Sequence, residues 1–338
     1  MSGHVLVARL DNEGDVLLAG PAIRAVAAGA EHVTLLCGPN GRQAAALLPG
    51  VDDIVVRRAE WIDPDPEPVR RGSIDAFVDE LAARRLDEAF ILSSFHQSPL
   101  PLALLLRMAG VPAIAATSVD YPGSLLDVRH RISDDVHEVE RSLSLVATRG
   151  YTLPDGDDGA LHVQAPAQAP LGEGGYVVVH PGASVPARAW APERNAELVR
   201  TLTAAGRRVA VTGAPSERAL TALVAGEDGI DLGGGTDFAG LAAVLAHADC
   251  VVVGNTGPAH LAAAVGTPVV SLYAPTVPEV RWRPWRVAHE LLYVDVPCAG
   301  CRARECPVPG HPCLGGVSVD EVVAAVGRLA AVREAAAA

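Results

Sequence analysis

The chain has 338 residues, of which 49% are hydrophobic and 20% are charged, a balance typical of globular domains and not of disordered segments. The formal net charge of −13 argues against nucleic acid as a partner, because nucleic-acid-binding surfaces need clustered cations. No run reaches the roughly 20 apolar residues of a membrane helix, and no secretory pattern is seen, so we expect a cytoplasmic protein without a transmembrane segment.

The first half of the chain alternates strand-like and helix-like segments. Strands are predicted at VLVARL, HVTLLC, DIVVR and AFILSS, and helices near residues 15–29, 40–48, 73–84 and 98–109. This alternation predicts a parallel sheet covered by helices on both faces. Residues 1–153 are therefore predicted to form a Rossmann-like domain.

The segment 154–175 is rich in proline, glycine and acidic residues, which is typical of an interdomain linker. The alternation then restarts at YVVVHPG and continues to a last helix near 318–334. We therefore expect an α/β fold of two Rossmann-like domains, the second spanning 176–338. The two domains are expected to face a cleft at the carboxyl ends of their sheets, where ligands tend to bind.

An acidic turn follows the first strand. Asp11, Glu13 and Asp15 stand where a phosphate-binding turn would carry glycines and bare backbone N–H groups. The turn also lacks the G-x-G-x-x-G pattern of dinucleotide-dependent oxidoreductases. These acids either stabilise the start of a helix through its dipole or supply a carboxylate for chemistry.

The segment CVVVGNTGPAH predicts a strand that runs into a helix N-terminus. Asn255 and Thr256 occupy N-cap positions, Gly257 permits close approach to the backbone, and His260 falls about one turn into the helix. Such a helix start is suited to bind an anion, although a capped helix without a ligand explains the same pattern.

Two further strand ends in this half carry candidate ligand-binding residues. HPGASVPAR supplies Gly182, Ser184 and Arg188, which together with the helix at Gly257 suggest a diphosphate held from two sides. In TGAPSER, Glu217 either accepts hydrogen bonds from a ribose or is a first-turn acid favoured by the helix dipole.

Four of the six cysteines fall in PCAGCRARECPVPGHPC, at Cys298, Cys301, Cys306 and Cys313. On spacing alone this segment suits a structural zinc site or an iron–sulfur cluster. Reduced or disulfide-linked structural cysteines are the alternative.

Taken together, GDVLLAGPAIRAV, GAS…ARAW, NTGPAHLAAAVGTPVV and the cysteine segment resemble the heptosyltransferase family, glycosyltransferase family 9, over essentially the whole chain. The resemblance implies the two-domain GT-B fold. It also implies inverting, metal-independent transfer of a heptose from a nucleotide diphosphate sugar, typically ADP-L-glycero-D-manno-heptose, to an acceptor hydroxyl, with no cofactor required. The nucleotide would bind the C-terminal domain and the acceptor the N-terminal one.

The resemblance also assigns roles to particular residues. It makes Asp15 the general base; Asp11 and Glu13 in the same turn are its rivals, and Glu13 is expected to line the acceptor side. His96, at a strand end of the acceptor half, is either a further acceptor-side residue or a capping or solvated histidine. The donor would be bound by Gly182, Ser184, Arg188, Glu217, Thr236, Asn255, Thr256, Gly257 and His260. Asn255 departs from the acid that many relatives have there, and Arg188 departs from a frequent lysine.

Other functions remain open at this stage. A sugar-nucleotide epimerase of the same architecture would need further acid–base residues, and the sequence offers no convincing set. A non-catalytic nucleotide-binding module would be expected to have lost the opening acid, whereas Asp15 is present. The acceptor could belong to lipopolysaccharide or to a natural-product pathway, and peripheral contact with a membrane is compatible with either.

Overall fold

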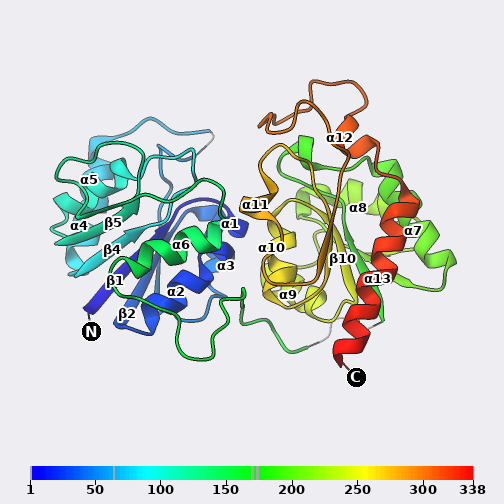
Figure 1. Cartoon of the computed structure of the whole chain (residues 1–338), viewed down its shortest axis with the longest axis horizontal. Coiled ribbons are helices and arrows are strands. Elements are labelled where there is room, and N and C mark those ends of the chain that lie inside the picture. The colour runs from blue at the N-terminus through cyan, green and yellow to red at the C-terminus, as the bar shows by residue number, and fades with distance from the viewer. Residues whose placement is uncertain (1, 64, 169–170, 173–174, 338) are drawn as a thin grey trace. The chain divides into compact units, whose positions relative to one another are not determined.

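The computed structural model describes residues 2–63, 65–168, 171–172 and 175–337 (Figure 1). The chain divides into two compact units, residues 1–162 and 163–338. The boundary falls inside the predicted linker, and residues 154–162 belong to the first unit. Within the described ranges, no helix is both long enough and apolar enough to cross a membrane.

The first unit is built on a parallel six-stranded sheet with the strand order β3-β2-β1-β4-β5-β6. Its strands are β1 (Ser2–Arg9), β2 (Ala30–Cys37), β3 (Asp53–Val56), β4 (Glu88–Ile91), β5 (Ala113–Thr117) and β6 (Val128–His130). Its helices are α1 (Glu13–Leu18), α2 (Gly20–Ala27), η1 (Pro39–Gly41), α3 (Arg42–Ala45), α4 (Arg71–Ala83), α5 (Leu100–Met108) and α6 (Glu138–Ala147). Helices α2 and α6 pack against each other, and α4 packs against α5.

The helix predicted near residues 15–29 is divided into α1 and α2. Pro21 lies in the first turn of α2, where its missing N–H costs little, and the break comes at Ala19. Three further elements, β5, β6 and α6, were not predicted. Helix α6 begins with a capping box, because the His137 side chain accepts the Val139 N–H and Glu140 accepts the His137 N–H.

The second unit has a parallel six-stranded sheet of its own, ordered β12-β11-β10-β7-β8-β9. Its strands are β7 (Tyr176–His180), β8 (Arg208–Val211), β9 (Ile230–Asp231), β10 (Cys250–Gly254), β11 (Val269–Leu272) and β12 (His289–Leu292). Its helices are η2 (Pro186–Arg188), α7 (Pro192–Ala204), η3 (Pro215–Glu217), α8 (Arg218–Ala225), α9 (Phe238–Ala246), α10 (Gly257–Ala264), α11 (Glu279–Trp282), α12 (Pro312–Gly315) and α13 (Val319–Ala337).

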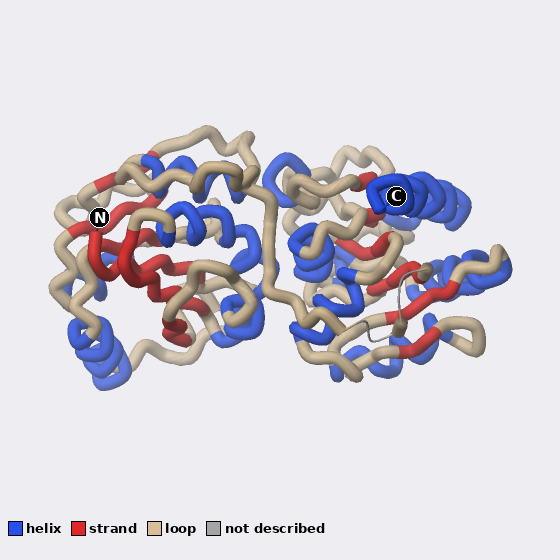
Figure 2. Tube along the Cα trace, turned by 90° about the horizontal axis from the view of Figure 1, so that it is seen from below, coloured by secondary structure: helices blue, strands red, loops and turns tan. Residues whose placement is uncertain are grey.

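Both sheets have the same topology when strands are counted from the first of each unit, so each is Rossmann-like. Strands and helices alternate along each unit, and helices flank the strands (Figure 2). Each strand order reverses between two neighbours, β1 and β4 in the first unit and β7 and β10 in the second. Ligands of such folds bind beyond the carboxyl ends of strands at this switch point, so functional residues are expected there.

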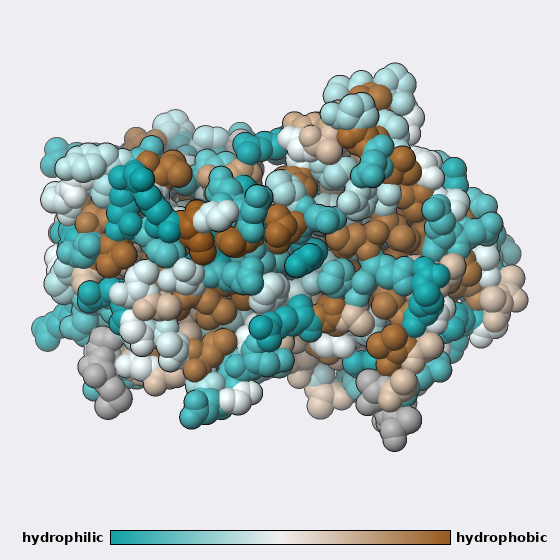
Figure 3. Space-filling model, in the orientation of Figure 1, coloured by the Kyte–Doolittle hydropathy of each residue, from teal (hydrophilic) through white to brown (hydrophobic). Residues whose placement is uncertain are grey.

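Apolar burial accounts for both sheets. The central strands are almost entirely aliphatic, with Val5, Leu6 and Val7 of β1 and Val177, Val178 and Val179 of β7 fully buried. A strand that is buried on both faces needs such continuous apolar runs, and β-branched residues fit a pleated sheet. The visible surface mixes hydrophilic and hydrophobic residues (Figure 3), as globular surfaces do.

An ion pair ties the end of the first unit to α2. The Arg24 guanidinium donates to both oxygens of Asp157, at 2.6 and 2.8 Å, and to the Ala160 carbonyl at 2.8 Å. These bonds hold residues that composition alone assigned to the linker. The Arg24 hydrogen bonds lower the pKa of Asp157 to about 2.

We expect Asp157→Asn to lower the free energy of unfolding at neutral pH by about 2 kcal/mol, because the native carboxylate is bound more tightly than the unfolded one. The pKa of Asp157 is depressed in the fold, so its contribution is complete above the unfolded value near 4 and is lost as the pH falls toward about 2. Urea denaturation at pH 7 and pH 3 measures this difference. The exposed Asp155→Asn variant is the control and should change stability by less than about 0.5 kcal/mol.

Candidate functional site

The switch point of the first unit brings together the loops that follow β1 and β4. Asp11, in the first loop, accepts hydrogen bonds from the Ser94 hydroxyl at 3.2 Å and from the Gln97 amide, both in the second loop. These bonds occupy the carboxylate of Asp11, which is only 7% exposed. Asp11 therefore fixes the two loops to each other.

Arg9, the last residue of β1, is the centre of a buried ion cluster. Its side chain is 2% exposed and contacts Asp11 at 2.8 Å, Asp15 at 2.8 Å and Glu138 at 3.2 Å. Its guanidinium also donates to the Ser94 hydroxyl at 2.8 Å. Burial alone would lower the pKa of Arg9, but the three carboxylates outweigh it and raise the pKa above its ordinary value. Arg9 is therefore a permanent cation.

Asp15 differs from the other two carboxylates of the cluster in its exposure. Its side chain is 22% exposed, against 7% for Asp11 and 2% for Glu138, and Arg9 contacts its Oδ1 atom. Burial, together with the charges of Asp11 and Glu138, raises the pKa of Asp15 to about 6 against the opposing effect of Arg9. A carboxylate of this kind is ionised at neutral pH and is basic enough to accept a proton.

The two residues expected on the acceptor side lie near this cluster in the chain but outside it. Glu13 is the first residue of α1 and is half-buried, and burial raises the pKa of its carboxyl group. His96, in the loop after β4, is exposed and stacks edge-on against Phe95 with 5.2 Å between ring centroids. The structure places both at the carboxyl edge of the sheet and gives neither a contact with Asp15.

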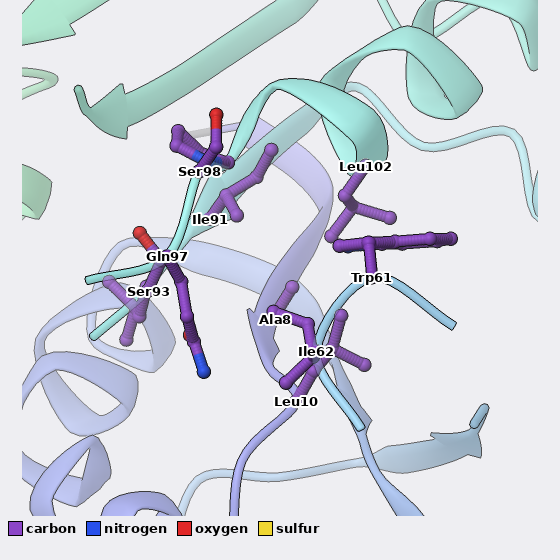
Figure 4. Close-up of a pocket in the computed structure, with 11 residues that line it drawn as sticks. Ala8, Leu10, Trp61, Ile62, Ile91, Ser93, Gln97, Ser98 and Leu102 are labelled. Carbon is purple, nitrogen blue, oxygen red and sulfur yellow. The ribbon is translucent and has the colours of Figure 1, made fainter. Parts of the chain in front are cut away.

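A small cavity of about 10 Å³ lies under the loop after β4 (Figure 4). The Trp61 ring lies beside Leu102, with Ala8 and Ile62 nearby and Gln97 on the side of the loop. A space of this size holds about one water molecule and is too small for a sugar. The cavity is a packing gap and not a substrate site.

In the second unit, the loops after β7 and β10 meet at the corresponding switch point. A side chain at Gly254, the last residue of β10, would place its Cβ 2.5 Å from the carbonyl oxygen of Arg188. Glycine is therefore needed for η2 to pack against the end of β10. This contact places Arg188, which is half-buried, beside the segment that leads into α10.

Helix α10 starts directly after that segment. Thr256 is its N-cap but makes no side-chain cap bond, and its buried hydroxyl has no hydrogen-bond partner among the described residues. Gly257 and Pro258 open the first turn, but proline has no N–H, and the Ala259 N–H donates to the Thr256 carbonyl at 3.0 Å, so the Gly257 N–H is the backbone donor that this turn can offer to a ligand. His260, one turn further, is buried at 6% exposure. The helix start thus offers the Gly257 N–H and the Thr256 hydroxyl, and its role in binding an anion stays a prediction.

The Asn255 side chain joins two loops of the second unit. Its amide nitrogen donates to the Ala274 carbonyl at 3.1 Å, and its amide oxygen accepts the Ala274 N–H at 3.2 Å. This reciprocal pair fastens the end of β10 to the loop after β11. The predicted donor-binding role of Asn255 stays a prediction, and the structure shows a structural role for both of its polar atoms.

Glu217 lies between the ends of β7 and β8. Its carboxylate accepts the Ala214 N–H at 2.8 Å, and a Cβ at Gly182 would come 2.1 Å from it. It also faces His180, whose pKa is lowered by burial against the opposing charge of Glu217. Glu217, the last residue of η3, thus caps the Ala214 N–H before η3, and its predicted contact with a ribose stays a prediction.

Two other predicted donor residues lie on exposed loops. Ser184 is exposed between β7 and η2, and Thr236 is half-buried in the loop before α9. Asp237, beside Thr236, is the N-cap of α9 and accepts the Gly240 N–H at 2.7 Å. Both predicted residues therefore lie at loop positions that leave their side chains accessible.

The four clustered cysteines line one small, mainly apolar pocket of about 40 Å³ together with His311. All six cysteines are free thiols. The part of the chain that the structure describes contains no group of three or more His, Cys, Asp or Glu side chains that could hold a metal ion. The structure thus gives no support to the zinc and iron–sulfur alternatives.

The backbone of the cysteine segment braces the loops of the second unit. The Ala187 N–H donates to the Arg304 carbonyl at 2.9 Å, and the Arg302 N–H donates to the Thr276 carbonyl at 3.0 Å. Ala187 precedes Arg188 in η2, so the hydrogen bond to the cysteine segment holds the turn that carries Arg188.

Two Rossmann-like units, each built on a parallel six-stranded sheet, have the architecture of the GT-B glycosyltransferases. The model of the family described as glycosyltransferase family 9 (heptosyltransferase) matches residues 91–311, more than half of the chain. The chain therefore belongs to this family.

Particular relatives agree with this assignment. Lipopolysaccharide heptosyltransferase 1 of Pseudomonas aeruginosa PAO1 is 28% identical over 316 residues, 90% of this chain and 87% of that protein. Lipopolysaccharide heptosyltransferase 3 of Escherichia coli K12 is 30% identical over 162 residues, 44% of this chain and 47% of that protein, so the match spans about half of that relative. The solved structure of E. coli ADP-heptose lps heptosyltransferase II has a TM-score of 0.75 at 18% identity and covers 99% of this chain and 100% of that one.

Proposed function

We propose that this chain is an inverting glycosyltransferase that transfers a heptose from ADP-heptose to a hydroxyl group of a lipopolysaccharide-type saccharide. Membership of glycosyltransferase family 9 and the names of its relatives support the donor and the acceptor class. The observation that carries the proposal is Asp15. It is the most exposed carboxylate of the Arg9 cluster, and burial raises its pKa to about 6.

In the proposed reaction, an acceptor hydroxyl oxygen attacks the anomeric carbon of the donor sugar from the face opposite the nucleotide. The new carbon–oxygen bond forms as the bond to the phosphate oxygen breaks, and its electron pair leaves with the diphosphate. Asp15 takes the proton of the hydroxyl and becomes a carboxylic acid. A positioned base of this kind is typically worth about 10²–10⁴-fold in rate.

The second unit would bind the leaving diphosphate. Negative charge builds up on the phosphate oxygens as the bond breaks, and fixed donors stabilise it. Arg188 supplies a planar, permanently charged fork, and the start of α10 supplies the Gly257 N–H with the Thr256 hydroxyl beside it. We propose that these groups replace a metal ion, so that no cofactor is required.

The direct test is to incubate the purified protein with ADP-heptose and a deacylated lipopolysaccharide core, with and without EDTA. We expect ADP release and an acceptor whose mass increases by one heptose in both samples, with inverted anomeric configuration by NMR. Isomerisation of the donor without transfer would replace the proposal by the epimerase alternative. Transfer that EDTA abolishes and a single added metal restores would refute metal independence.

The rate of transfer should depend on the ionisation of Asp15. Because the base must be deprotonated, we expect kcat/KM to fall tenfold per pH unit below an apparent pKa of about 6 and to be level above it, up to the next ionisation. Initial rates between pH 4.5 and 8 measure this limb. An acidic limb near pH 4, the ordinary value of an aspartate, would show that the reacting base is a different group.

A further inference from the structure

We propose that Arg9 and Glu138 are positioning residues for Asp15: Arg9 fixes the orientation of the carboxylate, and Glu138 tunes its affinity for the proton through their shared arginine. This inference rests on the proposed role of Asp15 as the base. It adds two residues that neither the acidic turn nor the family motif points to. Glu138 lies 129 positions from Arg9 in the chain.

The geometry supports a single electrostatic unit. The three nitrogens of the Arg9 guanidinium are divided among Asp11, Asp15 and Glu138, so no carboxylate has a whole cation to itself. Arg141 adds a second cation, donating to Glu138 at 3.3 Å and to the Ser93 carbonyl at 2.9 Å. Three carboxylates thus face two guanidinium groups, which leaves one excess negative charge.

Glu138 is held rigidly in this unit. It is the first residue of α6 and 2% exposed, and the capping box at His137 and Glu140 fixes the start of that helix. Its two oxygens contact Arg9 and Arg141 separately. A buried charge in a fixed position acts on its neighbours with little screening, whereas a mobile surface charge does not.

Other charged groups lie around Asp15 but differ in their partners. Asp11 is bound by Ser94 and Gln97, and Glu13 is on the same helix as Asp15. Two arginines belong to helices that pack against α1: Arg42 is on α3, and Arg24 is on α2, where Asp157 binds it. Among the residues that the structure describes, Glu138 is the one charged partner of Arg9 from outside the first 15 residues, so it can be changed without altering the acidic turn.

Two charge-neutralising variants should move the proton affinity of Asp15 in opposite directions. Glu138→Gln keeps the shape and an acceptor for Arg9 but removes a negative charge, so the acidic limb of the pH–rate profile should move down by about half a unit to one unit. Arg141→Gln removes a positive charge from Glu138, so the limb should move up by a similar amount. Glu140→Gln makes the same charge change in the same helical turn and preserves the capping box, and it should leave the limb unchanged.

The same shifts can be measured without turnover. ¹³C NMR of aspartate carboxyl carbons, with Asp15→Asn identifying the resonance, should give an Asp15 pKa that falls in Glu138→Gln and rises in Arg141→Gln. This readout is independent of the proposed transfer, so a protein without transferase activity still tests the inference. Arg9→Lys keeps the charge but cannot contact three carboxylates, and it should lower kcat with little change in the KM for the donor.

Unchanged titration of Asp15 in both Glu138→Gln and Arg141→Gln would overturn the inference, whether or not the protein transfers a sugar. So would shifts of the same size in Glu140→Gln, because they would report the helix and not the buried cluster. If circular dichroism shows that Glu138→Gln does not fold, Arg141→Gln gives the decisive result, because this change removes a partner of Glu138 and leaves the three carboxylates around Arg9 in place.

Discussion

Asp15→Asn is expected to slow sugar transfer by about 10²–10⁴-fold while leaving the affinity for ADP unchanged. The amide matches the carboxylate in shape but cannot take a proton from the acceptor hydroxyl. Nucleotide affinity should not change, because Asp15 belongs to the first unit and the proposed diphosphate donors to the second. Steady-state rates with saturating donor, together with calorimetric titration of ADP, measure both quantities.

The same substitution should make the fold more stable at neutral pH. Burial and neighbouring charges raise the native pKa of Asp15 to about 6, above the unfolded value near 4. The free energy of unfolding therefore falls as the pH rises from about 4 to about 6, because the fold must hold a carboxylate that it disfavours. Asparagine removes that cost, which is of the order of 2–3 kcal/mol. A variant that loses activity and gains stability fits a catalytic group, whereas loss of both would indicate a structural residue.

Glu13→Gln is the matched control for Asp15→Asn. It removes a half-buried carboxylate from the same short helix, two residues away, and one whose pKa is also raised by burial. We expect less than about a tenfold change in rate, since Glu13 has no contact with the Arg9 cluster. If Glu13→Gln were the more damaging variant, the assignment of the base would pass to Glu13.

Arg188→Ala should weaken binding of ADP by about 10- to 100-fold. A charged hydrogen bond to phosphate is worth roughly 1.5–3 kcal/mol, and the change does not touch the Gly257 N–H or the Thr256 hydroxyl at the start of α10. The arginine side chain is only half-buried, so the fold should be retained. Calorimetric titration with ADP, GDP, UDP and TDP measures both the loss of nucleotide affinity and the preference for the nucleobase.

Arg200→Ala gives the control for the lost charge. Arg200 is exposed near the C-terminal end of α7, in the same unit, and is not at the carboxyl edge of the sheet. ADP affinity should stay within about twofold in this variant. Equal losses in the two variants would mean that net charge and not a contact from Arg188 governs binding, and preference for another nucleotide would remove ADP-heptose as the donor.

Local patterns in the sequence were sufficient for most of the strands and helices and for the choice of the strand ends that are candidate sites. The run CVVVGNTGPAH encodes both a buried strand and the start of a helix, and the structure has β10 ending at Gly254 and α10 starting at Gly257. The acids after β1 were identified as the unusual feature of the first turn. Each of these signals depends on neighbouring residues, which is why a single sequence displays them.

Longer-range features could not be predicted in the same way. Asp11 and Asp15 look equivalent in the sequence, but Ser94 and Gln97 engage Asp11, while Asp15 is more exposed. Asn255 was expected to contact a ligand, and its amide is bound to Ala274. Hydrogen-bond partners from other loops decide such roles, and no local pattern records them.

The sequence by itself determined two α/β halves, an acidic turn in the first and a helix start suited to an anion in the second, because hydrophobic periodicity and capping are local properties. Only the tertiary structure decided which acid is bound by neighbouring loops and which one remains accessible. Helix α6 was not predicted, yet it brings Glu138 to an arginine 129 residues earlier. Burial and shared charge at that point set the pKa of Asp15, and both depend on which distant segments the fold packs together.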